Sequence, residues 1–199
     1  MKPGTPVGKL ARRLQVSPTL KTSRVLHRRS DPPGQHGRRK GRKKSVFGEQ
    51  LIEKQKLRFQ FMVSEKAVRR AFADAKRKPG KTGDLLIELL DRRLDATVFR
   101  SGIVRSPRAA QQLICHGHVF VNGKKLDRSS YAVKATDEIS LSEKSMKFPF
   151  IIEGLREANP VTYIRLDKET AKFQRSGEAT RADIPVICDE QQIVEWYSR

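Results

Sequence analysis

The sequence is poor in cysteine and has no long apolar run. Its two cysteines, Cys115 and Cys188, lie far apart in 199 residues and form no C-x-x-C pair, which is typical of a cytosolic chain with ordinary thiols. No apolar stretch approaches the roughly 18 residues of a membrane-spanning helix. Residues 1–10 are too polar, and too rich in proline and glycine, for a signal peptide. We therefore expect a cytoplasmic protein that has no transmembrane helix.

Acidic residues are also scarce relative to basic ones. The chain has 42 Lys and Arg against 22 Asp and Glu, a formal net charge of +20. Residues 1–58 hold 17 of these cations and 3 of the acids, so this part carries a net charge of +14. A positive field of this size is normally neutralised by a polyanion, and nucleic acid is the usual one. An anionic membrane surface is the alternative partner.

The segment 28–44, RRSDPPGQHGRRKGRKK, has almost no apolar side chains to bury. Its prolines and glycines disfavour a helix, and alone in water it cannot offset its own ordering entropy. We therefore expect residues 28–44 to be the flexible part of a basic arm over residues 1–45. Gln35 and His36 lie among the cations of this arm, where flat polar side chains can meet bases or riboses while arginines hold phosphates.

Apolar side chains recur at helical spacing between residues 45 and 102. We predict one helix over 45–63, a second that begins after residue 64, and a third that ends at Gly102. Short polar connections join these helices into a small helical body. Their predicted buried stripes are Phe47, Leu51, Ile52, Phe59 and Met62; Val68, Ala71, Phe72 and Ala75; and Leu86, Leu89, Leu90, Leu94 and Val98.

Residues 106–123, SPRAAQQLICHGHVFVNG, predict a short helix that leads into a tight hairpin. Ser106 can cap the helix, Pro107 suits its first position and Gly117 can end it. The alternation that follows is typical of a strand, and Asn122-Gly123 is a strong hairpin-turn signal. Cations around this joint make it a suitable surface for a phosphate backbone. Further along, we predict short strands over 129–133, 138–141, 162–166 and 184–187, and helices over 148–159 and 192–197.

No metal-binding or nucleophilic constellation stands out. The first two histidines have no cysteine nearby, and His116 and His118 alternate across a predicted strand, so their side chains should point to opposite faces. Cys115 precedes His116, but adjacent helical residues do not face each other, so we expect Cys115 in the core. Residues 80–82 lack the glycine-rich lead that a P-loop needs.

One enzyme motif remains as an alternative. Arg93-Leu94-Asp95, followed by Thr97, resembles the catalytic-aspartate motif of RNA pseudouridine synthases. In those enzymes the motif lies in a large catalytic domain that follows an RNA-binding module. Here it lies on a predicted helix at the start of the candidate module, with too few residues elsewhere for such a domain. A second alternative is a free RNA chaperone for stalled ribosomes.

Several segments together indicate a family. Residues 93–123 resemble the S4 RNA-binding module, which synthetases, pseudouridine synthases and heat-shock RNA binders share. PGQHG at 33–37, SVFGEQLIEKQK at 45–56 and IVEWYSR at 193–199 are similar to signatures and the C-terminus of the ribosomal protein S4 family. The module alone is only moderately specific for this family. The four segments in this order, over nearly the whole chain, are highly specific for it.

The resemblance implies an α+β fold with four parts. They are a basic N-terminal arm (1–45), a helical body (46–90), an S4-type (αL) RNA-binding module (91–158), and C-terminal strands and a helix (159–199) that pack back on the body or the module. It also implies a non-enzymatic protein of the bacterial or organellar small ribosomal subunit. Such proteins bind the 5′ domain of 16S rRNA directly, nucleate assembly, lie near the mRNA path and influence decoding accuracy through neighbouring ribosomal proteins; some repress their own operon.

The chain departs from this family at several positions. Many members begin with a four-cysteine zinc site, whereas this chain has no cysteine before Cys115, so we expect no metal, no other cofactor and no small-molecule substrate. The family usually places arginine where Ile52, Pro107 and Gln111 stand, so contacts there cannot be copied from relatives. The expected RNA-binding residues are Gln35, His36, Arg38, Arg39, Lys40, Arg42, Lys43, Lys44, Lys54, Lys56, Arg58, Arg92, Arg93, Arg105, Ser106, Arg108, Gln112, His116, Gly117, Asn122, Gly123 and Lys124.

Overall fold

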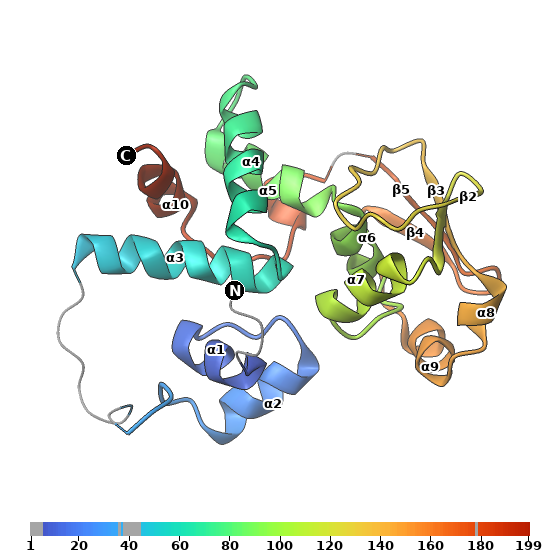
Figure 1. Cartoon of the computed structure of the whole chain (residues 1–199), viewed down its shortest axis with the longest axis horizontal. Coiled ribbons are helices and arrows are strands. Elements are labelled where there is room, and N and C mark those ends of the chain that lie inside the picture. Colours follow the sequence, from blue (N-terminus) through green and yellow to red (C-terminus); the bar gives the residue numbers. More distant parts are fainter. Residues whose placement is uncertain (1–5, 36, 38–44, 178) are drawn as a thin grey trace. The chain divides into compact units, whose positions relative to one another are not determined.

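The computed structural model describes residues 6–35, 37, 45–177 and 179–199 (Figure 1). The chain forms two compact units: the first comprises Met1–Leu86 and Val186–Arg199, and the second comprises Ile87–Pro185. Helix α5, Thr82–Asp91, runs from the first unit into the second. Among the described residues, no helix is both long enough and apolar enough to cross a membrane.

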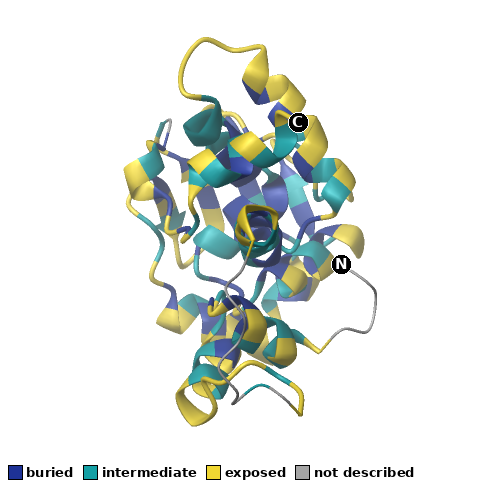
Figure 2. Ribbon diagram, turned by 90° about the vertical axis from the view of Figure 1, so that its left-hand side faces the viewer, coloured by how far each residue is buried: buried dark blue, intermediate teal, exposed yellow. Residues whose placement is uncertain are grey.

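The described part of the first unit is helical. It contains α1 (Val7–Leu14), α2 (Leu20–Arg28), α3 (Val46–Phe61), α4 (Glu65–Lys76), the start of α5 and the C-terminal α10 (Glu190–Tyr197). The predicted start of the second helix is confirmed, because the Ser64 hydroxyl caps α4 by accepting a hydrogen bond from the N–H of Ala67. Ser45 caps α3 in the same way through the N–H of Gly48. Buried residues gather where the helices face one another and exposed residues lie on their outer sides (Figure 2).

Helices α1 and α2 lie within the basic arm expected over residues 1–45, almost entirely before the segment 28–44 for which flexibility was predicted. Ala11 and Leu14 of α1 are buried together with Phe59 of α3, so this short helix contributes to a small hydrophobic cluster. Thr19 and Thr22 form a reciprocal capping box at the start of α2. These helices were not predicted because the N-terminal segment is highly charged and contains only a few apolar residues. Residues 1–5, 36 and 38–44 of the expected arm lie outside the described residues.

Helix α3 buries two faces rather than one. Ile52, Phe59 and Met62 belong to the predicted stripe and pack in the cluster with α1. Phe47, also predicted in that stripe, is 53% exposed. A different set of α3 residues is buried as well, and it includes the polar side chains of Gln50, Lys54 and Arg58. The helix therefore lies between neighbours on two sides, with α10 as one of them.

The single helix predicted to end at Gly102 is divided in two. Helix α5 ends at Asp91, and α6 comprises Leu94–Arg100. Between them Arg93 has an extended backbone and pairs with Ala132 in an isolated β-bridge, while the N–H of Leu94 donates to the carbonyl of Tyr131 at 2.8 Å. These hydrogen bonds to a distant segment replace the backbone hydrogen bonds of a continuous helix. The spacing of apolar residues in the local sequence cannot reveal such a replacement.

The second unit contains a five-stranded antiparallel sheet with the order β2-β1-β3-β5-β4. In this register Val121 pairs with Lys124, Val119 with Leu141 and Ile139 with Phe173. Short helices accompany the sheet, and the α+β class is confirmed. The elements after α6 are α7 (Pro107–Cys115), β1 (Val119–Val121), β2 (Lys124–Lys125), β3 (Glu138–Leu141), α8 (Glu143–Met146), α9 (Pro149–Glu157), β4 (Ile164–Asp167), β5 (Lys172–Arg175) and the 3-10 turn η1 (Arg181–Asp183).

The prediction of strands was only partly correct. The strand at 138–141 is confirmed, and the one near 162–166 is found as β4. The segments 129–133 and 184–187 form no ladder, since the first contributes only the bridge at Ala132. Strand β5 was missed because Phe173 alternates with a buried arginine, Arg175, rather than with a second apolar residue.

A buried ionic cluster explains why Arg175 is buried. Arg175 donates to the Oδ2 atom of Asp91 through Nη1 at 3.1 Å and Nη2 at 3.2 Å, and Arg100 Nε lies 3.3 Å from Oδ1. The Asp91 side chain is fully buried, and the guanidinium of Arg175 lies over the ring of Tyr163. Burial, reinforced by the charge of Asp91, raises the pKa of Tyr163, so its hydroxyl stays neutral. This cluster ties β5 to the end of α5 within the second unit.

Candidate RNA-binding surface

Helix α7 and the hairpin of β1 and β2 form the joint that the sequence predicted. The Ser106 hydroxyl accepts the N–H of Ala109 at 3.2 Å, and Pro107 occupies the first helical position. Gly117 ends the helix with a φ of +73°, a left-handed conformation that costs glycine little. A Cβ atom at Gly117 would clash with the side chain of Lys125, so this cation lies directly over the end of α7.

The hairpin turn is held by its backbone conformation and by side-chain hydrogen bonds from Asn122 to Asp137 and Glu138. Asn122 and Gly123 both have positive φ, 51° and 75°, as the two central residues of a type I′ turn require. The Asn122 side chain accepts the N–H of Glu138 and donates to Asp137, each at 2.9 Å. Burial would raise the pKa of Asp137, but the backbone N–H of Lys134, Asn122 and Tyr131 donate to its carboxylate and hold the pKa below its ordinary value. Asn122 is exposed at the turn although its side chain is hydrogen-bonded.

Exposed polar and charged side chains surround this joint. Arg108 and Gln112 on α7, His116 at its end and Lys124 on β2 are all exposed. Among the described residues, the side chains of Arg108, Lys124 and the neighbouring Lys125 have no hydrogen-bond or ion-pair partner. Unpaired cations on a fixed helix and hairpin are suited to contact phosphates, because binding does not first have to break an internal ion pair.

Arg105 lies just before α7 but is engaged by acidic residues of α9. Its Nη2 lies 2.6 Å from Glu153 and 3.3 Å from Glu157, with all three side chains more than half exposed. The hydrogen bond and charge of Glu153, with those of Glu157, raise the pKa of Arg105 above its ordinary value. An RNA phosphate would have to compete with two carboxylates for this guanidinium.

Arg93 and its neighbour Arg92 are less accessible. Arg93 binds Asp95 in a bidentate pair, with Nε 3.0 Å from Oδ1 and Nη2 2.8 Å from Oδ2. Gln111, at a position where the family usually has arginine, donates to the same carboxylate at 2.9 Å. Asp95 is 2% exposed. This aspartate, which suggested the enzyme alternative, is thus held in a structural ion pair instead of facing an open site.

The cations predicted on α3 point into the first unit. The side chains of Lys54 and Arg58 are only 9% and 10% exposed, and both lie within 3.3 Å of the Glu65 carboxylate. Lys54 Nζ also lies 4.6 Å from the centre of the Trp196 ring. Lys56 is paired with Glu53 at 2.6 Å. The structure therefore engages these three cations in internal contacts.

Glu65 joins α3, α4 and α10 at this point. Besides its two cations, its carboxylate accepts a hydrogen bond from the Tyr197 hydroxyl at 2.9 Å. Burial would raise the pKa of Glu65, but the Tyr197 hydrogen bond and the charges of Lys54 and Arg58 outweigh it and lower the pKa. The same hydrogen bond, added to burial, raises the pKa of Tyr197. We call Glu65 with Lys54, Arg58, Trp196 and Tyr197 the Glu65 cluster.

The predicted arm residues fall mostly outside the described part of the chain. Gln35 is described and is exposed in a turn. The others, His36, Arg38, Arg39, Lys40, Arg42, Lys43 and Lys44, lie outside the described residues.

Sequence reasoning missed a group of cations on α4 and the turn after it. Val68, Phe72 and Ala75 of the predicted stripe are buried and Ala71 is half-buried, while the opposite side of the helix is exposed. Helical spacing places the cations there, so the stripe itself was the signal that could have found them. The exposed set is Lys66, Arg69, Arg70, Lys76, Arg77, Lys78 and Lys81.

Cys115 was expected in the core, but it is exposed at the last position of α7. The buried face of that helix is already occupied by Ala110, Leu113 and Ile114, which leaves the next position turned to solvent. His118 lies near the Ser142 hydroxyl, at 3.2 Å from its Nδ1. In the described part of the chain, no three His, Cys, Asp or Glu side chains are grouped so that they could hold a metal ion.

Comparisons with known proteins cover nearly the whole chain. Residues 4–91 match the family model described as the ribosomal protein S4/S9 N-terminal domain, and residues 92–139 match that of the S4 domain. A curated protein of Streptomyces griseus named small ribosomal subunit protein uS4 is 42% identical over 200 residues, which cover 98% of this chain and 97% of that protein. Proteins of the same name from Streptomyces avermitilis and Streptomyces coelicolor are 41% and 40% identical, with the same coverage.

Proposed function

The chain belongs to the uS4 family of small ribosomal subunit proteins, and from this membership we propose that it binds the 5′ domain of 16S rRNA directly. Membership makes it an rRNA-binding structural protein of the small subunit that takes part in translation, and not an enzyme. We further propose that it nucleates assembly of the subunit, contacts neighbouring ribosomal proteins near the mRNA path in the cytoplasm, and influences decoding accuracy.

The observation that carries the proposal is the set of unpaired cations on the α7–hairpin joint. Arg108 and Lys124 lie on two rigid elements whose geometry is fixed by the Ser106 cap and the Asn122 turn. Phosphate contacts from such elements position a protein on RNA, and the shape of the folded RNA then supplies specificity. The exposed cations of α4 extend the positive surface of the first unit in the same way.

Binding to separate rRNA transcripts tests the proposal. We expect the protein to bind a 5′-domain transcript more tightly than a 3′-domain transcript of equal length at the same salt concentration. Replacing Arg108 and Lys124 together by alanine should reduce the slope of log affinity against log salt by about 2, since each phosphate contact contributes about 1. Equal affinity for both transcripts would contradict the proposed 5′-domain specificity.

A matched pair controls for the loss of charge. Arg165 and Lys168, around the β4–β5 turn of the same unit, are exposed and carry the same two charges. Their replacement by alanine should change the salt slope less than replacement of the pair at the joint. If both double variants behave alike, the joint is not the RNA-binding surface.

The assembly and decoding parts of the proposal need separate experiments. Omitting the protein from a reconstitution of the small subunit should block incorporation of the other 5′-domain proteins. Fractionation distinguishes a ribosomal protein from a free RNA chaperone, because only the former is present in every small subunit in equal amount. Variants that weaken contact with neighbouring proteins should change the frequency of misreading in a reporter assay.

A further inference from the structure

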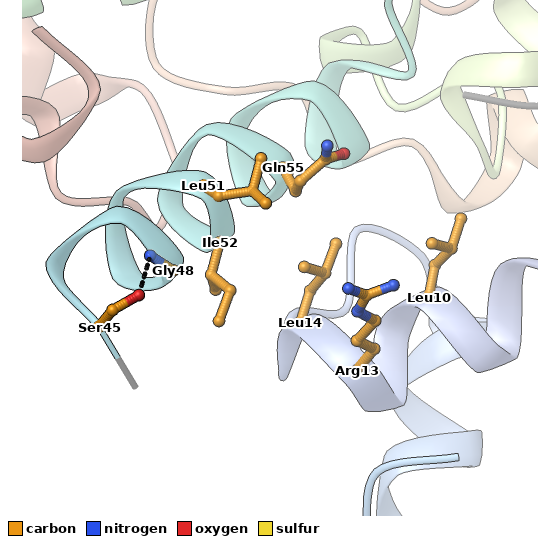
Figure 3. Close-up of a pocket in the computed structure, with 8 residues that line it drawn as sticks. All are labelled: Leu10, Arg13, Leu14, Ser45, Gly48, Leu51, Ile52 and Gln55. Carbon is orange, nitrogen blue, oxygen red and sulfur yellow. Dashed lines mark hydrogen bonds between the residues drawn. The ribbon is translucent and has the colours of Figure 1, made fainter. Parts of the chain in front are cut away.

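A cleft between α1 and α3 in the first unit shares no residue with the α7–hairpin joint or the Glu65 cluster. Its volume is about 410 Å³, within the range of about 300–1,000 Å³ that is usual for small-ligand sites. Figure 3 shows Leu10 and Leu14 of α1 directed towards α3, and Ile52 directed back towards Leu14. Leu51 adds a further apolar side chain, and the polar lining residues are Arg13, Ser45 and Gln55.

Of the polar side chains that line the cleft, one already forms a hydrogen bond within the protein and two do not. The hydroxyl of Ser45 accepts the N–H of Gly48 at 3.2 Å, so it serves as the cap of α3. In the described part of the chain, the side chains of Arg13 and Gln55 have no hydrogen-bond or ion-pair partner. The cleft therefore combines apolar walls with one cation and one amide that can still bind a ligand.

Charge indicates which ligand fits. The surrounding residues 1–58 carry a net charge of +14, and an unpaired guanidinium at an apolar wall favours a ligand with an anionic and an apolar part. A nucleotide has both, because its base presents flat faces to apolar side chains and its phosphate binds arginine. A neighbouring hollow shares Arg13, Leu14 and Ile52 but is also lined by Glu49 and Glu53, whose carboxylates would repel a phosphate. The acid-free cleft is thus the better site.

We propose that the cleft between α1 and α3 holds one unstacked nucleobase of the bound rRNA. The base lies between the leucines of α1 and Leu51 and Ile52 of α3, the Gln55 amide hydrogen-bonds its edge, and Arg13 binds an adjacent phosphate. Bases splayed out of loops and bulges are the usual targets of specific RNA recognition by proteins. The inference rests on the proposed rRNA binding and adds a base-reading site outside the S4-type module.

Chemical probing of base accessibility in the 5′-domain transcript tests the inference. The wild-type protein should protect at least one unpaired base that Leu51→Phe, which fills the cleft, leaves reactive, while the other protections remain. The affinity of this variant should fall about 5-fold, the lower end of the effect of losing a base stacked on an aromatic ring, because the walls of the cleft are aliphatic. Arg13→Ala and Gln55→Leu should weaken binding and expose the same base.

Control variants separate the cleft from general effects of charge and folding. Arg24 on α2 is exposed and, among the described residues, has no partner, so Arg24→Ala removes the same charge as Arg13→Ala but should leave the base protected. Fluorescence of Trp196 and far-UV circular dichroism verify that each variant is folded. A folded Leu51→Phe with unchanged protections and affinity would overturn the inference.

Other outcomes are equally decisive. If Leu51→Phe binds the transcript normally and is defective only in subunits that contain the other proteins, a protein segment occupies the cleft and the inference is wrong. If the wild-type protein fails to bind the transcript, the proposed rRNA function fails first, and the base-reading site fails with it.

Discussion

Replacing Glu65 by glutamine should release the C-terminal helix from the first unit. The substitution keeps the shape of the side chain but removes the charge that Lys54 and Arg58 face at 3.3 and 3.2 Å. Both cations would then stay about nine-tenths buried without their counter-ion. Breaking a fully buried pair costs about 3–5 kcal/mol. Because the Glu65 side chain is 28% exposed, water screens part of this effect, and we expect about 2–3 kcal/mol.

The single tryptophan provides the assay. Trp196 lies on α10 in the Glu65 cluster, with its ring 4.6 Å from both Lys54 Nζ and the Phe47 ring centre. Undocking of α10 should therefore shift its fluorescence to longer wavelength at a lower urea concentration than in the wild type. Tyr197→Phe, which removes only the hydroxyl that donates to Glu65, should cost about 1–2 kcal/mol and serves as the milder partner in a double-mutant cycle.

The result that would refute this reasoning is specific. If Glu65→Gln leaves the fluorescence maximum and the unfolding midpoint unchanged, the Glu65 cluster does not hold α10. If Glu65→Gln and Tyr197→Phe have strictly additive effects, the two side chains do not interact in solution as the 2.9 Å hydrogen bond indicates.

Further predictions concern acid, the buried cluster of the second unit and the hairpin joint. The stabilisation from ionised Glu65 should be complete above its ordinary pKa of 4.5 and should be lost as the pH falls through its lower folded-state pKa. Acid titrations followed by Trp196 fluorescence should show this loss in the wild type and not in Glu65→Gln. Arg175→Met leaves the Asp91 charge buried with only Arg100 beside it, so urea unfolding should show a loss of about 3–5 kcal/mol. Asn122→Ala loses two hydrogen bonds at a residue with positive φ, and the same measurement should show a loss of about 2–4 kcal/mol. Ser106→Ala should cost about 1 kcal/mol by removing the cap of α7; a loss under about 0.3 kcal/mol would contradict that role.

The joint of α7 and the hairpin was predictable because every signal in it is local. Ser106, Pro107, Gly117 and the positive φ of Asn122 and Gly123 concern residues at most a few positions away, and each has the predicted role in the structure. The side-chain hydrogen bonds of Asn122 with Asp137 and Glu138 are distant and were not predicted. The rigid part of the candidate surface could therefore be placed from the sequence.

Elements that depend on distant partners could not be predicted in the same way. The break between α5 and α6 results from hydrogen bonds with residues 129–132, and the burial of Lys54 and Arg58 depends on Glu65 and on a helix more than 130 residues away. Charge was taken as a sign of solvent or RNA contact, but an ion pair between secondary structures buries the same side chains. The exposed cations of α4 were not predicted either, because the helical spacing was used only to identify the buried stripe of this helix and not its exposed side.

The salt dependence of binding to the 5′-domain transcript tests the central claim most directly. If the exposed cations engage 6–10 phosphates, the affinity should fall by roughly 10³–10⁵ between 50 and 200 mM salt. Filter binding or fluorescence anisotropy at several salt concentrations yields the slope. An affinity that stays nearly constant over this range would contradict the claim that phosphate neutralisation dominates binding.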